Sequence, residues 1–390
     1  MEFRFDKMHG LGNDFAVFED WGACVNLTPA QATLLCDRHF GIGADGLIFI
    51  RSSRTRGCRA FMHYLNADGT LAQMCGNGIR CMAKYLVDHG FVDDGQPFVD
   101  IETRAGVRRV SIMRDDMGRF ESATVDMGTP EFDPQRIPVS CAADATTPDG
   151  APCVRDLEIG TPWGEFRFTL VSMGNPHAVC FLEDFDSLPD EAFTDARRKG
   201  LETLRVDAIG PYIEHSPLFP EKTNVEFVEP HELGLAMRVW ERGCGETLAC
   251  GTGACAVNVA AALRGVAGRE NHVMLPGGTL RISWTESGQV LMAGPAEHVW
   301  SGVIDIPDSA LCGSRRVPRG VSRPSSPAPY AQRALPGSMS GQRPLPLRRS
   351  LRRSPRATPE RATPGDTARR PPARATRWSS PRRAPRRRCG

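Results

Sequence analysis

Two copies of one motif decide the fold of this chain: Met74-Cys75-Gly76-Asn77-Gly78 and Ala249-Cys250-Gly251-Thr252-Gly253. Each cysteine is followed by Gly-x-Gly and then by apolar residues at helical spacing, as far as a glycine 15 positions beyond the cysteine. The pattern predicts two equivalent helices, over about 79–86 and 254–264, each beginning beside a thiol.

The similarity of the two halves extends beyond these helices. Gly12-Asn13 in the first half corresponds to Gly174-Asn175 in the second, and a polar residue ends a predicted strand nine residues before each cysteine: Asn66 and Glu241. An internal duplication of a strand-rich α+β unit accounts for these matches. The alternative is that two Gly-rich helix starts match by chance.

Other segments give a coarse secondary structure. Alternating or continuous apolar residues predict strands, for example over 2–5, 15–18 and 47–50, and the Gly-rich stretch 9–14 predicts a loop. Thr28-Pro29 is a typical helix start and predicts a helix to about His39. A further helical segment is expected near Asp190–Leu204.

The charge distribution divides the chain into two different parts. Residues 313–390 contain 21 arginines, 14 prolines, no lysine and only two acidic residues, whereas the first 312 residues contain 27 basic and 44 acidic residues. Residues 313–390 are too poor in apolar residues to form a core, so we expect this basic tail to be disordered. A tether to nucleic acid is one interpretation. A solvated extension, or translation past a lost stop codon, is favoured over it.

Cysteine content and hydropathy indicate the compartment. The chain has 13 cysteines, no signal-like apolar stretch after Met1, and no run of about 18–20 apolar residues of the kind that crosses a membrane. These features predict a reduced, cytoplasmic protein without a membrane span, whose thiols are buried or functional rather than paired.

The setting of Cys75 and Cys250 suggests acid–base chemistry. Free N–H groups and the positive end of the dipole at a helix N-terminus are expected to lower the pKa of a thiol and to bind a carboxylate. Two such thiols on opposite faces of an amino acid's α-carbon can remove a proton from one face and return one to the other. No Cys-x-x-Cys pair or pyridoxal lysine motif is present, so we expect neither a metal nor a cofactor.

Other polar residues are ambiguous when they are taken one at a time. An asparagine at a strand end is usually a turn former, but four in the two halves favour substrate contacts: Asn13, Asn66, Asn175 and Asn224. His177 either tunes a thiol or is an ordinary histidine. Glu241-Arg242 is either an exposed ion pair or a recognition site for a second ammonium and carboxylate.

Seven segments in this order resemble diaminopimelate epimerase, and the resemblance covers about residues 1–308: LGNDF, FGIGADG, NADG, MCGNGIRC, GNPHAV, TNVEF and ERGCGETLACGTGA. It implies two pseudo-symmetric α+β domains, each a strand layer wrapped around a central helix, with the active site in the interdomain cleft. The expected boundaries are 1–126, completed by a last strand over about 297–310, and 127–296.

The resemblance also implies the reaction and the residues that carry it. The reaction is the interconversion of LL- and meso-diaminopimelate without a cofactor, in lysine and peptidoglycan-precursor synthesis, by a homodimer. Cys75 and Cys250 match the base and acid thiols, and His177 and Glu241 match groups that tune them. The substrate-binding positions that match are Asn13, Asn66, Gly76, Asn77, Asn175, Asn224, Glu241, Arg242, Gly251 and Thr252.

Two departures and two alternatives remain open at this point. Many members of the family have Gln where this chain has Gly46, and the basic tail has no counterpart in the family pattern. A proline or hydroxyproline racemase on the same fold is one alternative, although such a substrate would leave Glu241-Arg242 without a distal centre to recognise. A nucleic-acid-binding protein that acts through the tail is the other, and the acidic body argues against it.

Overall fold

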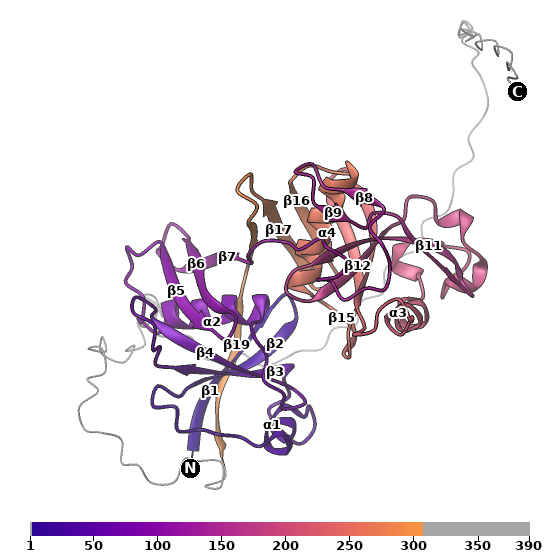
Figure 1. Ribbon diagram of the computed structural model, residues 1–390. Helices are drawn as coiled ribbons and strands as arrows, with labels where there is room; N and C mark the ends of the chain where they lie inside the picture. The colour runs from indigo at the N-terminus through magenta and orange to yellow at the C-terminus, as the bar shows by residue number, and fades with distance from the viewer. Residues whose placement is uncertain (1, 307–390) are drawn as a thin grey trace, which may run out of the picture. The chain divides into compact units, whose positions relative to one another are not determined.

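The structure is a computed structural model that describes residues 2–306, and Figure 1 shows their helices and strands. The predicted disorder of the basic tail, and the end of the predicted last strand, lie outside the described residues. Hydrogen bonds connect 17 strands into one continuous sheet, in which two similar sets of strands can be traced.

The first set consists of strands in the hydrogen-bonded order β1 (Glu2–Gly10), β2 (Asn13–Glu19), β3 (Gly46–Arg51), β4 (Ala60–Asn66), β5 (Phe98–Thr103), β6 (Gly106–Arg114) and β7 (Phe120–Asp126). The pairs β2–β3 and β4–β5 are parallel, and the other pairs are antiparallel. Helix α2 (Gly76–Asp88) connects β4 to β5.

The second set has the same pairing order: β11 (Gly164–Ser172), β12 (Pro176–Phe181), β13 (Asn224–His231), β14 (Gly234–Glu241), β16 (Glu270–Leu275), β17 (Gly278–Trp284) and β18 (Val290–Gly294). Here β12–β13 and β14–β16 are the parallel pairs. Helix α4 (Gly251–Arg264) connects β14 to β16, as α2 does in the first set. The predicted duplication and the α+β class are therefore confirmed.

The remaining elements extend or join the two sets. Strand β19 (Glu297–Asp305) pairs with β1, β10 (Leu157–Thr161) with β11, and β15 (Gly245–Thr247) with β14. Strands β7 and β18 pair with each other, so the two sets join through their last strands. The small ladder of β8 (Ala145–Thr146) with β9 (Pro152–Cys153), helices α1 (Pro29–Cys36) and α3 (Val206–Glu214) and three short 3-10 turns complete the described fold.

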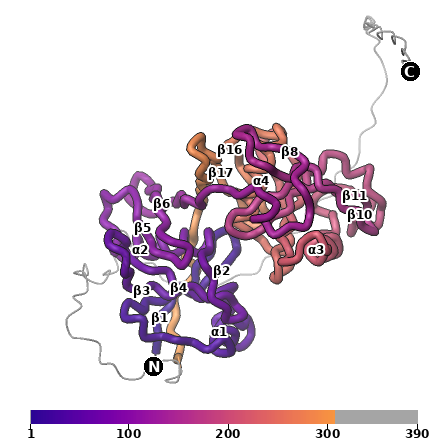
Figure 2. The backbone as a smooth tube through the Cα atoms, in the orientation of Figure 1, coloured from indigo at the N-terminus to yellow at the C-terminus, as the bar shows by residue number. Residues whose placement is uncertain are grey.

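The central helices are buried because the strands of their own set pack around them. Helix α4 packs against β11–β14 and β16–β18, and Figure 2 shows the chain passing on several sides of it. Its residues from Gly253 to Ala261 are all buried, and most are Gly, Ala or Val. Small side chains let strands approach a helix closely from several directions. Helix α2 is buried in the same way as far as Leu86.

Local predictions failed where a contact overrides propensity. Helix α1 ends at Cys36 rather than His39, because the Asp37 carboxylate accepts N–H bonds from His39 and Phe40 and turns the chain. Strand β1 continues through Gly10, so only a two-residue turn remains of the predicted loop.

The helix predicted near 190–204 is also wrong. That stretch contains short 3-10 turns at Asp190–Ala192 and Leu201–Thr203, and the α-helix follows at Val206–Glu214. Gly210 and Pro211 lie inside this helix, where both residue types are normally unfavourable. Gly210 is nevertheless suited to its place, because a Cβ there would lie 2.5 Å from the Cβ of Trp240.

Candidate active site

Each of the two predicted cysteines is the N-cap of its central helix. Cys75 and Cys250 both have extended backbone angles, and each Sγ accepts a hydrogen bond from the third helical amide, at 3.4 Å from Gly78 N and from Gly253 N. Sulfur thus takes the role that a Ser or Asp oxygen has at an ordinary helix start. The sequence prediction of two thiols at helix N-termini is confirmed in this respect.

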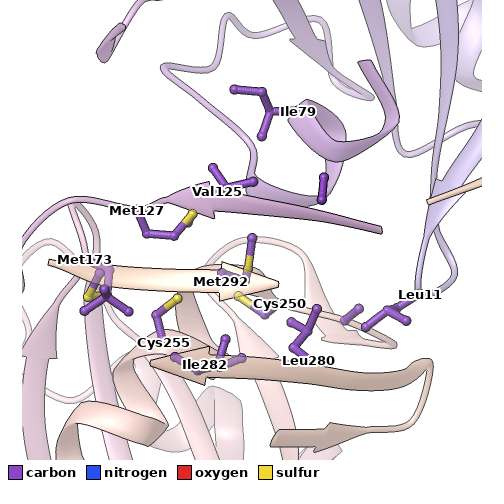
Figure 3. Close-up of a cluster of buried hydrophobic side chains, with 14 of the residues drawn as sticks. Leu11, Ile79, Val125, Met127, Met173, Cys250, Cys255, Leu280, Ile282 and Met292 are labelled. Atoms are coloured by element: carbon purple, nitrogen blue, oxygen red, sulfur yellow. The ribbon is translucent and has the colours of Figure 1, made fainter. Parts of the chain in front are cut away.

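One side chain from β18 lies beside both helix starts. A Cβ on Gly76 would lie 2.7 Å from Met292 Cε, and one on Gly251 would lie 3.0 Å from Met292 Sδ, so a side chain at either position would require the end of Met292 to move. Figure 3 shows Met292 beside Cys250 and next to the strand that carries Val125, its partner in the β7–β18 ladder. Met292 is fully buried.

Asn77 connects the two half-sites directly. Its Nδ2 donates to Asn13 Oδ1 and to the carbonyl oxygen of Ala249, the residue before Cys250, at 3.2 Å in both cases. Its Oδ1 accepts a hydrogen bond of 2.8 Å from the guanidinium of Arg80. Arg80 is fully buried and also donates to the carbonyl of Pro295 at 3.2 Å, which ties the start of α2 to the segment that enters β19.

The sheet register shows which residues of the two halves occupy equivalent places. Phe15 pairs with Gly46 across the parallel β2–β3 ladder as His177 pairs with Asn224 across β12–β13. The next alternate residues, Ile48 and Glu226, are therefore equivalent. The other equivalent pairs are Asn13 with Asn175, Asn66 with Glu241, Cys75 with Cys250 and Asn77 with Thr252.

Cys75 is half-buried and faces a carbonyl oxygen. Its Sγ lies 4.0 Å from Asn13 Oδ1, and Asn13 is oriented by a 2.9 Å hydrogen bond from its Nδ2 to Asp45 Oδ2. Asp45 is held in turn by Arg38, whose guanidinium also forms two hydrogen bonds to Asp14. A charged network on the first half's loops thus fixes the amide that meets this thiol.

Cys250 is buried and has different neighbours. Its Sγ lies 3.6 Å from Thr252 Oγ1, and Asn175 Nδ2 donates to the same hydroxyl at 3.3 Å. His177 Nε2 lies 3.1 Å from Asn175 Oδ1, and His177 Nδ1 lies 2.6 Å from Glu226 Oε1. The predicted residues Asn175, His177 and Thr252 are therefore brought together next to this thiol.

Glu226 is not among the residues predicted from the sequence, although its position carries a signal. This glutamate interrupts the apolar run of β13 between Val225 and Phe227, and the three side chains are fully buried. A charged residue type in a strand that is buried on both faces needs a partner. A glutamate within this apolar run therefore indicates a functional or paired residue.

Glu241 ends β14 and lies beside Cys250. Burial raises the pKa of its carboxyl, although hydrogen bonds from Thr247 and from the Cys250 thiol act in the opposite direction. Thr247 Oγ1 donates to Glu241 Oε1. The side chain also raises the pKa of the Cys75 thiol, so one carboxyl group acts on both sulfurs.

The expectation that the helix ends lower the thiol pKa is not met. Burial raises the pKa of Cys75 to about 11 from an ordinary value of 9.0, and backbone N–H groups of Gly78 and Asn77 reduce this effect without reversing it. Burial, with Glu241 and Glu226, raises the pKa of Cys250 well above its ordinary value. At both sulfurs, desolvation of the thiolate therefore outweighs the N–H groups of the helix terminus.

Backbone donors remain free at both helix starts. Among residues 2–306, no partner accepts from the N–H of Gly76, Gly251 or Thr252, as expected for the first turn of a helix. These groups lie next to the sulfur atoms on the same turns. The arrangement suits a bound carboxylate whose neighbouring carbon lies between the thiols.

The remaining predicted residues have protein partners of their own. Asn66 Nδ2 donates to Thr70 Oγ1 at 2.9 Å, within the turn after β4. Asn224 is buried, and its amide binds the carbonyl of Pro176 at 2.7 Å and accepts the Arg242 backbone N–H at 2.9 Å. Each amide nitrogen carries a second hydrogen, so these contacts still leave a donor for a ligand. The Arg242 guanidinium donates to the carbonyl of Glu221.

The space beside Gly46 is filled by Tyr64. A Cβ on Gly46 would lie 2.5 Å from Tyr64 Cε2 and 2.7 Å from the carbonyl oxygen of Leu65. The tyrosine ring is buried and packs edge-on against Phe15 at 5.8 Å between centroids. A larger residue at position 46 would therefore have to displace both a ring and the backbone of β4.

Three further observations concern metals, membranes and disulfides. In the part of the chain that the structure describes, no group of three or more His, Cys, Asp or Glu side chains is arranged to hold a metal ion. Within the same residues, no helix is long and apolar enough to cross a membrane. The 11 cysteines among residues 2–306 are all free thiols.

Solved structures of other proteins share this fold. A probable proline racemase from Agrobacterium radiobacter K84 has a TM-score of 0.55 and 17% identity, over 78% of this chain and 94% of its own. A hydroxyproline epimerase from Agrobacterium vitis has the same TM-score and 16% identity, over 78% and 92%. At these identities the likeness shows a shared fold and no more.

Sequence comparison identifies the family. The family pattern described as Diaminopimelate epimerase matches residues 5–132 and 169–299. The chain is 42% identical to the diaminopimelate epimerase of Leptospira biflexa over 307 residues, which are 78% of this chain and 100% of that protein. It is 44% identical to that of Desulfovibrio desulfuricans over 304 residues, 77% and 97% of the two chains. The chain belongs to the diaminopimelate epimerase family, and it is an amino-acid epimerase, an isomerase.

Proposed function

We propose that this chain interconverts LL- and meso-diaminopimelate, with Cys75 and Cys250 as the two acid–base groups. The observation that carries this proposal is the pair of thiols at equivalent helix N-termini, linked by the Asn77 amide through Asn13 and Ala249. The reaction as written uses only groups of the protein. It takes place in the cytoplasm, where thiols stay reduced, and supplies lysine and peptidoglycan precursors.

The substrate's reacting α-carboxylate binds between the two helix starts. It accepts hydrogen bonds from the N–H groups of Gly76 and Asn77 on one side and of Gly251 and Thr252 on the other. These donors stabilise the negative charge that develops on the carboxylate when the α-proton leaves. The four asparagines at the strand ends and loops contribute further substrate contacts: Asn13, Asn66, Asn175 and Asn224.

Inversion requires one ionised and one protonated sulfur. The thiolate on one face removes the α-proton, and the thiol on the other face delivers its proton to the opposite side of the carbon. The raised pKa of both thiols opposes ionisation of the sulfur that acts as the base. Hydrogen-bond donors to the sulfur, such as the N–H groups of Gly78 and Gly253, therefore assist the reaction. The roles of Cys75 and Cys250 exchange for the reverse reaction.

The distal, non-reacting centre of diaminopimelate is recognised by Glu241 and Arg242. The Glu241 carboxyl would bind an ammonium group, and the Arg242 side chain would bind a carboxylate. Glu241 and His177 also tune the thiols, since Glu241 acts on both sulfurs and His177 reaches Cys250 through Asn175. The equivalent place in the first half is Asn66, so only one half reads the distal centre.

Deuterium incorporation by purified chain in deuterated water tests the two-base reaction. Product formed from LL-diaminopimelate should carry solvent deuterium at the inverted carbon, and Cys75→Ala and Cys250→Ala should each reduce turnover by at least about 100-fold. Arg242→Ala should raise KM more than it lowers kcat. Near-normal turnover of either cysteine variant, with the fold intact by circular dichroism, would disprove the assignment.

We further propose two domains and a homodimer. The domains are 1–126, completed by the strand over about 297–310, and 127–296, because β7 ends at Asp126 and β19 returns to β1. The dimer uses β19, where Val299, Trp300 and Val303 are each 44–55% exposed. Apolar side chains gathered on one strand are typical of a contact surface. Light scattering should give twice the mass of the chain, and Val303→Asp should halve it.

A further inference from the structure

The second half-site contains a buried acid–base pair, and the reaction proposed above gives no role to its acidic member, Glu226. His177 and Glu226 are both fully buried, and His177 Nδ1 lies 2.6 Å from Glu226 Oε1. Placing a carboxyl group in a protein interior is costly unless its partners compensate. The pair therefore needs an explanation.

Packing does not explain this pair, because the first half fills the same place with apolar side chains. By the sheet register, Phe15 is equivalent to His177, and Ile48 is equivalent to Glu226. Ile48 Cδ1 lies 3.0 Å from the Cβ position at the third residue of α2, and Glu226 Oε1 lies 2.9 Å from the Cβ position at the third residue of α4. One fold position thus holds a hydrocarbon in one copy and a carboxyl group in the other.

The surroundings of Glu226 indicate that its carboxyl is protonated. Its second oxygen, Oε2, is buried and has no hydrogen-bond partner among the described residues. An unpartnered carbonyl oxygen of a neutral acid is less costly than an unpartnered carboxylate oxygen. Burial also raises the pKa of Glu226. The Oε1–H group therefore donates to Nδ1, and His177 carries its own proton on Nε2.

The proton on Nε2 determines the direction of the next three contacts. Nε2–H donates to Asn175 Oδ1 at 3.1 Å, so the Asn175 nitrogen faces Thr252 and donates to its Oγ1 at 3.3 Å. The Thr252 oxygen accepts this bond, and when Cys250 is a thiolate the hydroxyl hydrogen is the one that lies between Oγ1 and Sγ, 3.6 Å apart. Every donor in the series points toward the sulfur, and a donor to sulfur favours the thiolate.

We propose that Glu226 is a positioning residue for the epimerase reaction: it fixes the Nε2–H form of His177 and thereby directs the Asn175–Thr252 contacts to donate to Cys250. The inference rests on the role of Cys250 proposed above. It also accounts for the difference between the half-sites, because the Asn13 contact of Cys75 presents an acceptor to the sulfur.

The first test measures the protonation of His177 in the unmodified chain. Two-dimensional NMR of protein with ¹⁵N-labelled histidine, assigned by the signal that disappears in His177→Gln, reports which ring nitrogen carries hydrogen. The expected result at neutral pH is a protonated Nε2 and an unprotonated Nδ1. Any other pattern overturns the proposed direction of the series, and the measurement does not depend on activity.

The second test copies the apolar pair of the first half into the second. The double variant His177→Phe, Glu226→Ile should fold, since replacement of a buried polar pair by well-packed apolar residues is often neutral or stabilising. Its kcat should fall about 10- to 100-fold at little-changed KM, which corresponds to a change of about one to two pKa units at Cys250. Glu226→Gln keeps a donor to Nδ1 and should restore most of kcat relative to Glu226→Ile.

A folded double variant with kcat within about threefold of the unmodified chain would overturn the proposal, because that change is below half a pKa unit. Equal kcat values for Glu226→Gln and Glu226→Ile would also overturn the proposal. Failure of the role proposed for Cys250 can be distinguished from failure of this inference. In the first case Cys250→Ala would keep its turnover, and the NMR measurement on His177 would still report on Glu226. If the double variant does not fold, the measurement on the unmodified chain decides.

Discussion

The state of Cys75 before substrate binds gives a quantitative prediction. Its thiol pKa of about 11 is two units above the ordinary value of 9.0, which corresponds to about 2.7 kcal/mol against ionisation. At pH 8 the free enzyme should therefore hold about 0.1% of Cys75 as thiolate, compared with about 10% for a thiol of pKa 9. The resting enzyme should react slowly with alkylating reagents even though the thiol lies at a helix N-terminus.

The assay is brief exposure to iodoacetamide between pH 7 and pH 10, followed by mass spectrometry of the peptide that contains Cys75. Only the thiolate reacts, so the rate should rise about tenfold per pH unit across this range without levelling off. Glu241→Gln removes a carboxyl group that raises the thiol pKa, so this variant should react faster at each pH. Circular dichroism at each pH controls for unfolding.

A rate that reaches a plateau below about pH 9 would refute the reasoning, because Cys75 would then ionise at or below the ordinary thiol pKa of 9.0. In that case the N–H groups at the start of α2 would outweigh burial, as the sequence alone suggested. An unchanged rate in Glu241→Gln would remove that carboxyl group from the account but would leave the burial argument intact.

Two other predictions concern stability. Arg80→Met should lower the free energy of unfolding by about 2–5 kcal/mol in urea titrations, because Asn77 Oδ1 and the carbonyl of Pro295 lose buried donors; a loss below about 0.5 kcal/mol would contradict this. Stability should also fall as pH rises above about 9 under reducing conditions. Four buried thiols have a pKa of about 12 in the folded protein but ionise near a pH of about 8.5 in the unfolded chain, so high pH favours the unfolded chain. Thermal unfolding at pH 8 and pH 10 measures this second effect, which alanine substitution of these thiols should weaken: Cys36, Cys81, Cys180 and Cys255.

The sequence was informative about the parts of the site that keep a fixed distance from the cysteines. Asn66 and Glu241 each precede their cysteine by nine residues, so a comparison of the two halves in one dimension finds them. The helix starts are found in the same way, because each Cys-Gly-x-Gly motif runs directly into its helix in the sequence. The burial of a thiol, however, depends on residues that are distant in the sequence. The prediction of a lowered thiol pKa failed for that reason.

The remaining equivalences depend on sheet register, which a single sequence does not contain. Ile48 precedes Cys75 by 27 residues and Glu226 precedes Cys250 by 24, because the loops between the strands differ in length. Only the pairing of β2 with β3 and of β12 with β13 shows that these two side chains occupy one place under the helix start. Each half of the duplicated fold therefore serves as a control for the residue at the equivalent position of the other half. Where the halves agree, the residue serves the chemistry that both thiols share, as the N-cap sulfurs do. Where they differ at one place, as Ile48 and Glu226 do, packing alone is satisfied by the apolar member, so the polar member is the one to test for function.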